Sequence, residues 1–395
     1  MTEQTLPHPF KDKNLLCCLG LVVFIQLGLT PIIPVLPLMS TKLGFSIGKA
    51  SLAVAVYTLP SIFLTPFAGY LVDRFGRKEV LIPSVLLYAI AGGLCAFASS
   101  YVMLLWLRFF QGVGVVTFDV LFATIIGDLY HGKERVRNMG YVTTTFSLST
   151  AIMPIIGGGL ALIHWRIPFV LPIIALGYVF VVIKHLQLPK NKTKIAIAPY
   201  LRSVKQALFL NRAIVVYGMT VFGSIGTFGA FQIYFPKLIA TDFAGSPVAI
   251  GGMLTFTALI SAAVSTQLVL INKLLSKRMM LLTSFILYPI SICLVPFITN
   301  YYCFALPMLL NGIAQGMAYS MMLTVLSEAS GKGQRGAVMA INASMLTLGQ
   351  SIAPFVLLIP YNLGGYGWTF AIAAIFMAGC AYLVRFIKPT PSLIR

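Results

Sequence analysis

The chain has 395 residues, of which 58% are hydrophobic and only 9% charged, and its formal net charge is +19. Since an average soluble domain is about 25% charged, this composition excludes a water-soluble protein and requires most apolar side chains to face lipid. The alternating pattern of a membrane β-barrel is absent, so the sequence predicts an all-α membrane protein.

Twelve apolar runs, separated by charged or Pro- and Gly-rich breaks, are each long enough to cross a bilayer as a helix. The first run is too long for the apolar part of a signal peptide and is interpreted as an uncleaved helix. The predicted limits are 14–38, 49–72, 79–99, 102–127, 138–163, 166–187, 213–236, 247–271, 279–299, 301–327, 336–359 and 367–387.

The distribution of Lys and Arg predicts that both termini face the cytoplasm. With the amino terminus inside, the outer loops carry Lys42, Lys49, Arg166 and Lys237, and every other Lys and Arg except Arg108 falls on the inner side. The same scatter over short loops argues against a nucleic-acid surface. The six cysteines lie in or beside apolar runs without metal-ligand spacing, so we interpret them as packing residues.

The longest polar stretch divides the spans into two sets of six. We expect an N-terminal six-helix bundle over residues 1–187, a basic cytoplasmic linker over 188–212 and a C-terminal six-helix bundle over 213–395. Matching residues recur 200 positions apart, which indicates internal duplication, a common way of building transporters. The matches are Asp128 with Glu328, Arg135 with Arg335, Met139 with Met339, Pro154 with Pro354, and Gln111-Gly112 with Asn311-Gly312.

The loop between spans two and three concentrates charge in a chain that has little elsewhere; from Gly69 to Val80 it reads GYLVDRFGRKEV. Its pattern Gly69-x-x-x-Asp73-Arg74-x-Gly76-Arg77-Lys78 resembles a motif of the major facilitator superfamily. Further stretches resemble that superfamily's twelve-span drug:proton antiporters: Gly28 to Pro37 (GLTPIIPVLP), Arg108-x-x-Gln111-Gly112-x-Gly114, Pro154-x-x-Gly157-Gly158 and Trp165-Arg166. The resemblance implies two pseudo-symmetric six-helix bundles of the major facilitator fold.

The resemblance also implies a gate on the cytoplasmic side. Asp73 would rest on the positive end of the span-eleven helix, where helix dipoles favour a carboxylate. Arg74 or Arg77 would pair with Asp128 at the end of span four, and Gly76 would allow the tight turn between them. The alternative is ordinary topology, in which membrane insertion alone places basic residues in this loop.

Arg108 and Asp119 are the clear charges inside the predicted membrane, and both lie in span four. A charge at the bilayer centre costs several kcal/mol, so it marks a functional position. Their spacing places them within about 20° of one helix face and about 16 Å apart along the axis, with Gln111 near that face. We expect this face to line a central cavity. Arg108 would lie somewhat above the midplane of the bilayer, toward its outer side, and Asp119 somewhat below it, toward the cytoplasm.

Asp119 is the candidate proton carrier, because removing a carboxylate from water favours its protonated form. The alternative is a structural Asp that accepts hydrogen bonds from Thr117 or Thr143. For Arg108, the superfamily motif implies a position in the cavity and contact with substrate or with the coupling proton.

Other polar residues of the spans are expected to line the cavity, although each is a candidate for a helix–helix hydrogen bond as well. They are Gln26, Thr30, Gln111, Tyr217, Gln232, Tyr234, Asn311, Gln315, Tyr319 and Asn342. In span five, Pro154 with Gly157 and Gly158 should bend the helix and let a neighbour pack closely.

The chain departs from the antiporters it resembles in two ways. It has Gln26 in span one and no central acid in spans seven, eight, ten and eleven, and Met153 precedes Pro154 where a glycine is usual. With Asp119 protonated, Arg108 would be the one fixed charge in the cavity, which favours anionic or zwitterionic substrates over lipophilic cations.

We therefore expect a secondary active transporter of a cell membrane, working by proton antiport and export on a small polar, amphiphilic, anionic or zwitterionic molecule. The alternatives are uptake of a small metabolite and a non-transporting sensor. The sequence contains no P-loop, and its four scattered histidines form no metal or catalytic pattern, so we expect no enzyme activity, cofactor or metal. The expected partners are substrate, protons and lipid, with no nucleic acid, and the expected state is monomeric.

Overall fold

The computed structural model describes residues 12–44, 47–130, 132–186, 208–209, 211–329 and 335–387, and the secondary structure of these residues is helical. The N-terminal half contains α1 (Lys13–Leu27), η2 (Thr30–Val35), α2 (Leu36–Leu43), α3 (Ile47–Phe75), α4 (Arg77–Leu94), η3 (Cys95–Phe97), α5 (Tyr101–Leu129), α6 (Gly132–Ile163), η4 (Ile167–Ile173) and α7 (Ile174–His185).

The C-terminal half contains α9 (Asn211–Thr227), η5 (Phe228–Tyr234), α10 (Phe235–Asp242), α11 (Pro247–Thr266), α12 (Leu268–Leu274), α13 (Lys277–Leu294), η6 (Val295–Phe297), η7 (Tyr301–Phe304), α14 (Ala305–Ala329), α15 (Arg335–Leu383) and η8 (Val384–Phe386). The predicted linker at 188–212 lies almost entirely outside the described residues, so the proposed bundle limits stay a prediction.

In the described part of the chain, ten helical stretches are long and apolar enough to cross a membrane. The prediction of an all-helical, multi-pass membrane protein is confirmed. Two further crossings are needed for twelve. α3 has 29 residues, although its apolar part is the shorter Lys49–Thr65. α15 is interrupted by non-helical backbone at Gly364 and Gly365, at the predicted break between spans eleven and twelve. The count of twelve stays a prediction.

Local chemistry explains where several helices begin. Side-chain oxygens of Ser100, Ser246 and Ser276 accept hydrogen bonds from backbone N–H groups two or three residues into the helix, as N-cap residues do. Pro247 then occupies the first position of α11, where its missing N–H costs nothing.

Helix boundaries repeat between the halves at the spacing of 200 residues that the sequence suggested. α4 and α13 occupy equivalent positions, as do η3 and η6, and each of these pairs is followed by a polar capping residue, Ser100 or Asn300. The repeat thus extends from single residues to the interruptions of the helices.

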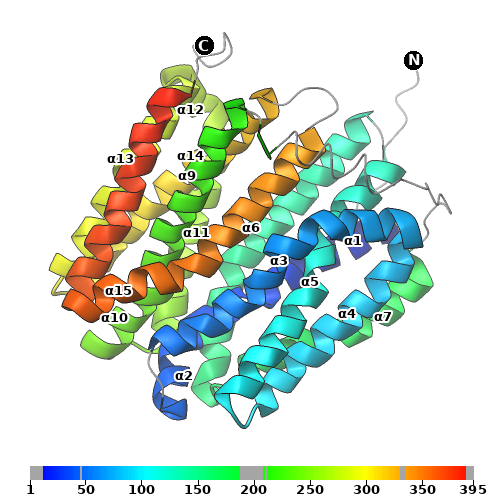
Figure 1. Ribbon diagram of the computed structural model, residues 1–395, viewed down its shortest axis with the longest axis horizontal. Helices are drawn as coiled ribbons and strands as arrows, with labels where there is room; N and C mark the ends of the chain where they lie inside the picture. The colour runs from blue at the N-terminus through cyan, green and yellow to red at the C-terminus, as the bar shows by residue number, and fades with distance from the viewer. Residues whose placement is uncertain are drawn as a thin grey trace.

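The halves lie side by side, with the N-terminal half in blue to green and the C-terminal half in green to red (Figure 1). Helix α6 packs along α11, and α3 packs along α15. We call the side that carries α2, α10 and the Gly364–Gly365 break the outer side, because the Lys and Arg distribution predicts it to be extracellular. There α2 packs on α10, and η2 packs on α11.

Contacts between the halves in the outer parts of the spans are close. Thr58 and Ser351 share a hydrogen bond of 2.6 Å between α3 and α15, and Thr255 of α11 donates to the carbonyl of Ala151 on α6. We interpret this arrangement as closed on the outer side.

Two spans that the sequence predicted as plain α-helices contain other helix types. In span one, Pro31 and Pro34 remove backbone donors, and the chain forms the 3₁₀ segment η2. In span seven, η5 is a π-helix without proline, and no local sequence signal predicts it.

Candidate functional site

Arg108 lies inside the N-terminal half and is 0% exposed. Its Nε donates to the carbonyl of Ala53 at 3.2 Å, and its Nη1 donates to the carbonyl of Gly28 at 3.0 Å. The guanidinium also lies 4.8 Å from the ring centroid of Tyr57 and 5.5 Å from that of Phe169. The cation is therefore surrounded by helices α1, α3 and η4, so in this conformation it is not at a cavity surface. Substrate contact by Arg108 stays a prediction.

Gln111 completes this buried cluster, since its Oε1 accepts from Arg108 Nη1 at 2.7 Å. Three polar atoms of the cluster have no hydrogen-bond partner among the described residues: Arg108 Nη2, Gln111 Nε2 and the hydroxyl of Tyr57. Such buried donors are normally satisfied, so this part of the bundle has unused hydrogen-bonding capacity. Sequence reasoning missed Tyr57 because it stands in an apolar run with no distinguishing neighbour.

Asp119 lies on the same helix, α5, but in a different environment. In contrast to Arg108, its side chain is exposed. The structural alternative is not favoured, because the hydroxyl of Thr117 donates to Gly114 and that of Thr143 donates to Met139. Neither hydroxyl is used to hold the carboxylate.

Tyr319 of the C-terminal half lies near Asp119. Its side chain is 49% exposed and is near enough to interact electrostatically with Asp119. Asp119 and Tyr319 occupy equivalent positions of the two repeats, on α5 and α14. Gln315, one turn before Tyr319, is exposed as well. Because Asp119 is close enough to Tyr319 for this interaction, it lies on a part of α5 that is near the C-terminal half.

The remaining predicted cavity residues are mostly engaged within their own halves. Gln26 donates to Thr150, Thr30 donates to the carbonyl of Gln26, Tyr217 donates to the carbonyl of Val338 at 3.4 Å, and Asn342 accepts from Thr220 at 2.7 Å; Asn311 and Tyr234 are buried, and Gln232 is half-buried. The structure thus brings Asp119 and Tyr319 near each other, with Gln315 one turn before Tyr319, and their substrate or proton contacts stay a prediction.

The charged loop after α3 is partly described. Of the two arginines expected to pair with Asp128, Arg77 does so, with 2.7 Å between Nη2 and the carboxylate. Arg74 instead donates to the hydroxyl of Tyr70 at 2.6 Å. Gly76 has a φ of +110°, a conformation that side chains disfavour, which explains the glycine. The side chain of Asp73 and residues 330–334 before α15 lie outside the described residues. The expected gate contact between Asp73 and the start of span eleven therefore lies outside them as well.

The span-five motif lies where α6 meets two other helices. A Cβ added to Gly157 would lie 2.0 Å from the carbonyl oxygen of Pro31, and one added to Gly158 would lie 2.3 Å from that of Pro247. Backbone atoms cannot yield to such contacts, so these glycines permit the close packing that was expected for Pro154, Gly157 and Gly158.

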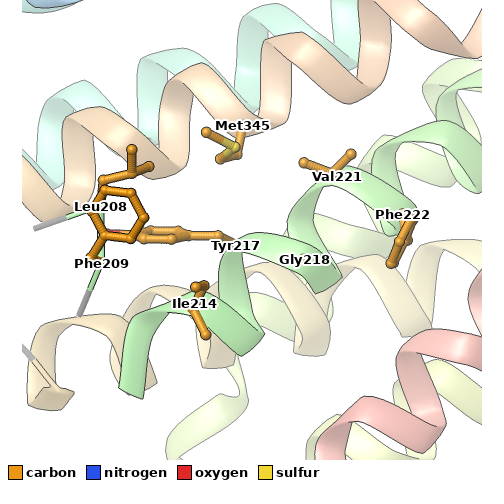
Figure 2. Close-up of a pocket in the computed structure, with 8 residues that line it drawn as sticks. All are labelled: Leu208, Phe209, Ile214, Tyr217, Gly218, Val221, Phe222 and Met345. Carbon is orange, nitrogen blue, oxygen red and sulfur yellow. The ribbon is translucent and has the colours of Figure 1, made fainter. Parts of the chain in front are cut away.

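An apolar pocket of about 350 Å³ lies at the inner end of span seven (Figure 2). Helix α9 and Met345 of α15 form its walls, and the ring of Tyr217 extends toward Leu208 and Phe209. Such a surface suits the apolar part of an amphiphilic molecule. In the described part of the chain, no group of three or more His, Cys, Asp or Glu residues could hold a metal ion.

The family model described as Major Facilitator Superfamily matches residues 16–238 and 218–394. The bacillibactin exporter of Bacillus subtilis (strain 168) is 28% identical over 358 residues, covering 87% of this chain and 88% of the exporter. Multidrug resistance protein 2 of the same organism is 26% identical, covering 84% of each chain. The quinolone resistance protein NorA of Staphylococcus aureus is 26% identical over 148 residues, 38% of each chain.

Solved structures share the fold at low sequence identity. The D-xylose–proton symporter superposes with a TM-score of 0.79 at 16% identity, covering 97% of this chain and 98% of its own. A mutant of the nucleoside transporter NupG gives a TM-score of 0.76 at 13% identity, covering 95% of this chain and 100% of its own.

Proposed function

Because the chain belongs to the major facilitator superfamily and is therefore a multi-pass membrane transporter of small molecules, not an enzyme, we propose that it is a proton-coupled antiporter that exports its substrate. Export is supported by the relatives along most of the chain, which are named as an exporter and a multidrug resistance protein.

Proton coupling rests on one observation: the Asp119 carboxylate is exposed, lies near Tyr319 of the other half and is not held by the hydroxyls of Thr117 or Thr143. A carboxyl group in that position gains or loses a proton as the transporter opens first to one side of the membrane and then to the other, because the charges and water around the group change. In the proposed cycle, Asp119 releases its proton when the cavity opens to the cytoplasm and is reprotonated when the cavity opens outward. Inward movement of protons thus drives outward movement of the substrate.

The substrate is proposed to be a small amphiphilic, anionic or zwitterionic molecule. The apolar pocket at α9 supports an apolar portion, and the polar side chains of Gln315 and Tyr319 support a polar portion. Arg108 would influence substrate binding indirectly, because it donates a hydrogen bond to the carbonyl of Gly28, where helix α1 ends.

The cytoplasmic gate is proposed to be Asp73 resting on the start of α15 when the inner side is closed, with Arg77 and Asp128 fixing the loop. We interpret this conformation as closed on the outer side. The proposed contact between Asp73 and the start of α15 would be broken in it. We further propose that the transporter acts as a monomer, which light scattering of the purified protein in detergent would check.

Reconstitution into liposomes with an imposed pH gradient tests the coupling. Fluxes of ethidium, salicylate and a quinolone sample cationic, anionic and zwitterionic substrates, and the direction of proton movement separates export from uptake. For the transported probe, we expect Asp119→Asn to abolish pH-driven accumulation while retaining exchange without a gradient. Glu134→Gln, an acid at the inner end of α6, is the matched control and should keep the coupling. Unchanged pH-driven flux in Asp119→Asn would remove Asp119 from the mechanism.

A further inference from the structure

A lysine on the outer side of the C-terminal half is held by aromatic rings. Lys237 of α10 is half-buried, and its Nζ lies 3.8 Å from the ring centroid of Tyr361 on α15, to whose hydroxyl it donates a hydrogen bond. The ring of Tyr366 lies 6.0 Å away. This position was predicted only as one of the few basic residues of the outer loops.

Lys237 has no carboxylate partner within 4.0 Å among the described residues. The nearest acid along the chain is Asp242, whose Oδ1 accepts from Thr241, and Thr241 also shares a hydrogen bond of 2.9 Å with Tyr366. In the part of the chain that the structure describes, this half-buried ammonium is surrounded by rings and a phenol and has no anionic partner. It therefore has capacity to bind an anion.

A second donor is available beside Lys237. Tyr234, three residues earlier and thus a neighbour on the helix surface, is 0% exposed, and its hydroxyl has no hydrogen-bond partner in the described chain. Its ring lies 5.2 Å from that of Tyr361. Tyr234 also ends the π-helix η5, and π segments are found frequently at functional sites.

The location connects this cluster with transport. Helix α10 packs on α2 of the N-terminal half. The cluster therefore lies on a helix of the outer contact between the halves, and this contact must open when the outer side opens. The equivalent residue of the first repeat is Pro37, so the N-terminal half has no matching cation.

We propose that Lys237, Tyr234 and Tyr361 form a binding subsite for an aromatic carboxylate at the outer end of the transport path. The carboxylate takes hydrogen bonds from Lys237 Nζ and the Tyr234 hydroxyl, and its ring packs against Tyr361. This inference rests on the proposed export function and assigns it an anionic, aromatic class of substrate.

The test uses the full-length protein in lipid nanodiscs and equilibrium dialysis of radiolabelled benzoate. We expect saturable benzoate binding that excess unlabelled benzoate displaces and the neutral isostere benzamide does not. Lys237→Gln should weaken binding at least about tenfold, because it removes the charge-assisted hydrogen bond, and Tyr234→Phe should weaken it by a smaller factor. Lys42→Gln, at an exposed lysine of α2, is the matched control and should bind benzoate as the wild type does.

Lys237→Arg, which keeps the charge, guards against misfolding as the cause of a loss and should retain most binding. The proposal is overturned if benzoate does not bind saturably, if benzamide competes equally, or if Lys237→Gln binds as tightly as the wild type. Asp119→Asn separates this proposal from proton coupling. Benzoate binding that survives in Asp119→Asn, whatever happens to pH-driven flux, shows that the subsite does not depend on the coupling residue.

Discussion

Arg108 and Asp119 stand 11 residues apart on one helix, and the structure gives them different surroundings. Sequence alone identified both, because ionisable residues inside apolar spans are rare and costly. It could not show that Arg108 binds the carbonyls of Gly28 and Ala53, since those partners are 80 and 55 positions away. The helical periodicity that placed both residues on one face does not determine which neighbour covers each part of that face.

Replacing Arg108 with Gln should destabilise the N-terminal half. The change leaves the carbonyls of Gly28 and Ala53 without their donor, and each unsatisfied buried group costs about 1–3 kcal/mol. We expect a loss of at least about 2 kcal/mol in the free energy of unfolding, measured by denaturant titration in mixed micelles. Arg385→Gln, at an exposed position beside Tyr382, should cost less than about 1 kcal/mol; equal losses in the two variants would contradict the assigned role.

Helix α6 shows what could be predicted at the scale of an element. Its Pro154-x-x-Gly157-Gly158 pattern indicated close packing, but not which helices would approach. The structure supplies the partners: η2 on one side and α11 of the other half on the other. The 3₁₀ segment in span one follows from its prolines, whereas the π-helix η5 depends on tertiary contacts that no local pattern encodes.

Neighbouring glycines of α6 provide a matched pair for testing this packing. Gly158→Ala places a methyl group 2.3 Å from the carbonyl oxygen of Pro247, whereas at Gly159 no atom lies within 4 Å of the added carbon. We expect Gly158→Ala to reduce the transport rate at least about tenfold and to lower the melting temperature, because α6 and α11 must separate. Gly159→Ala should stay within about twofold of the wild type in liposome flux. A normal rate in Gly158→Ala would show that transport tolerates a separation of α6 from α11.

Over the whole molecule, apolar runs, loop charges and the repeat at 200 residues were sufficient to predict the fold, because lipid restricts a spanning chain to very few solutions. They were not sufficient to predict the conformation. Which side is closed depends on contacts between the halves such as that of Thr58 with Ser351, where two common residues meet across 293 positions.

The Thr58–Ser351 hydrogen bond should favour the conformation that contains it. Hydrogen bonds between membrane helices contribute about 0.6 kcal/mol on average and up to about 1.7 kcal/mol, enough to change a two-state ratio by roughly 3- to 18-fold. We expect Ser351→Ala to increase the outward-open population by a factor in this range, measured by spin-label distances across the outer ends of α2 and α10. Ser284→Ala, whose hydroxyl bonds within α13, should leave the distance distribution unchanged. A shift of equal size in both variants would count against a specific role of the Thr58–Ser351 hydrogen bond.

The position that holds Arg108 in the first repeat holds Met308 in the second, where Thr257 meets a sulfur at 3.3 Å in place of a guanidinium clamp. We therefore expect the N-terminal half to move as a rigid body during transport, and bending to be concentrated in the C-terminal half. Deuterium uptake should accordingly be faster at the middle of α14 than at the middle of α5, and faster still while substrate is being turned over.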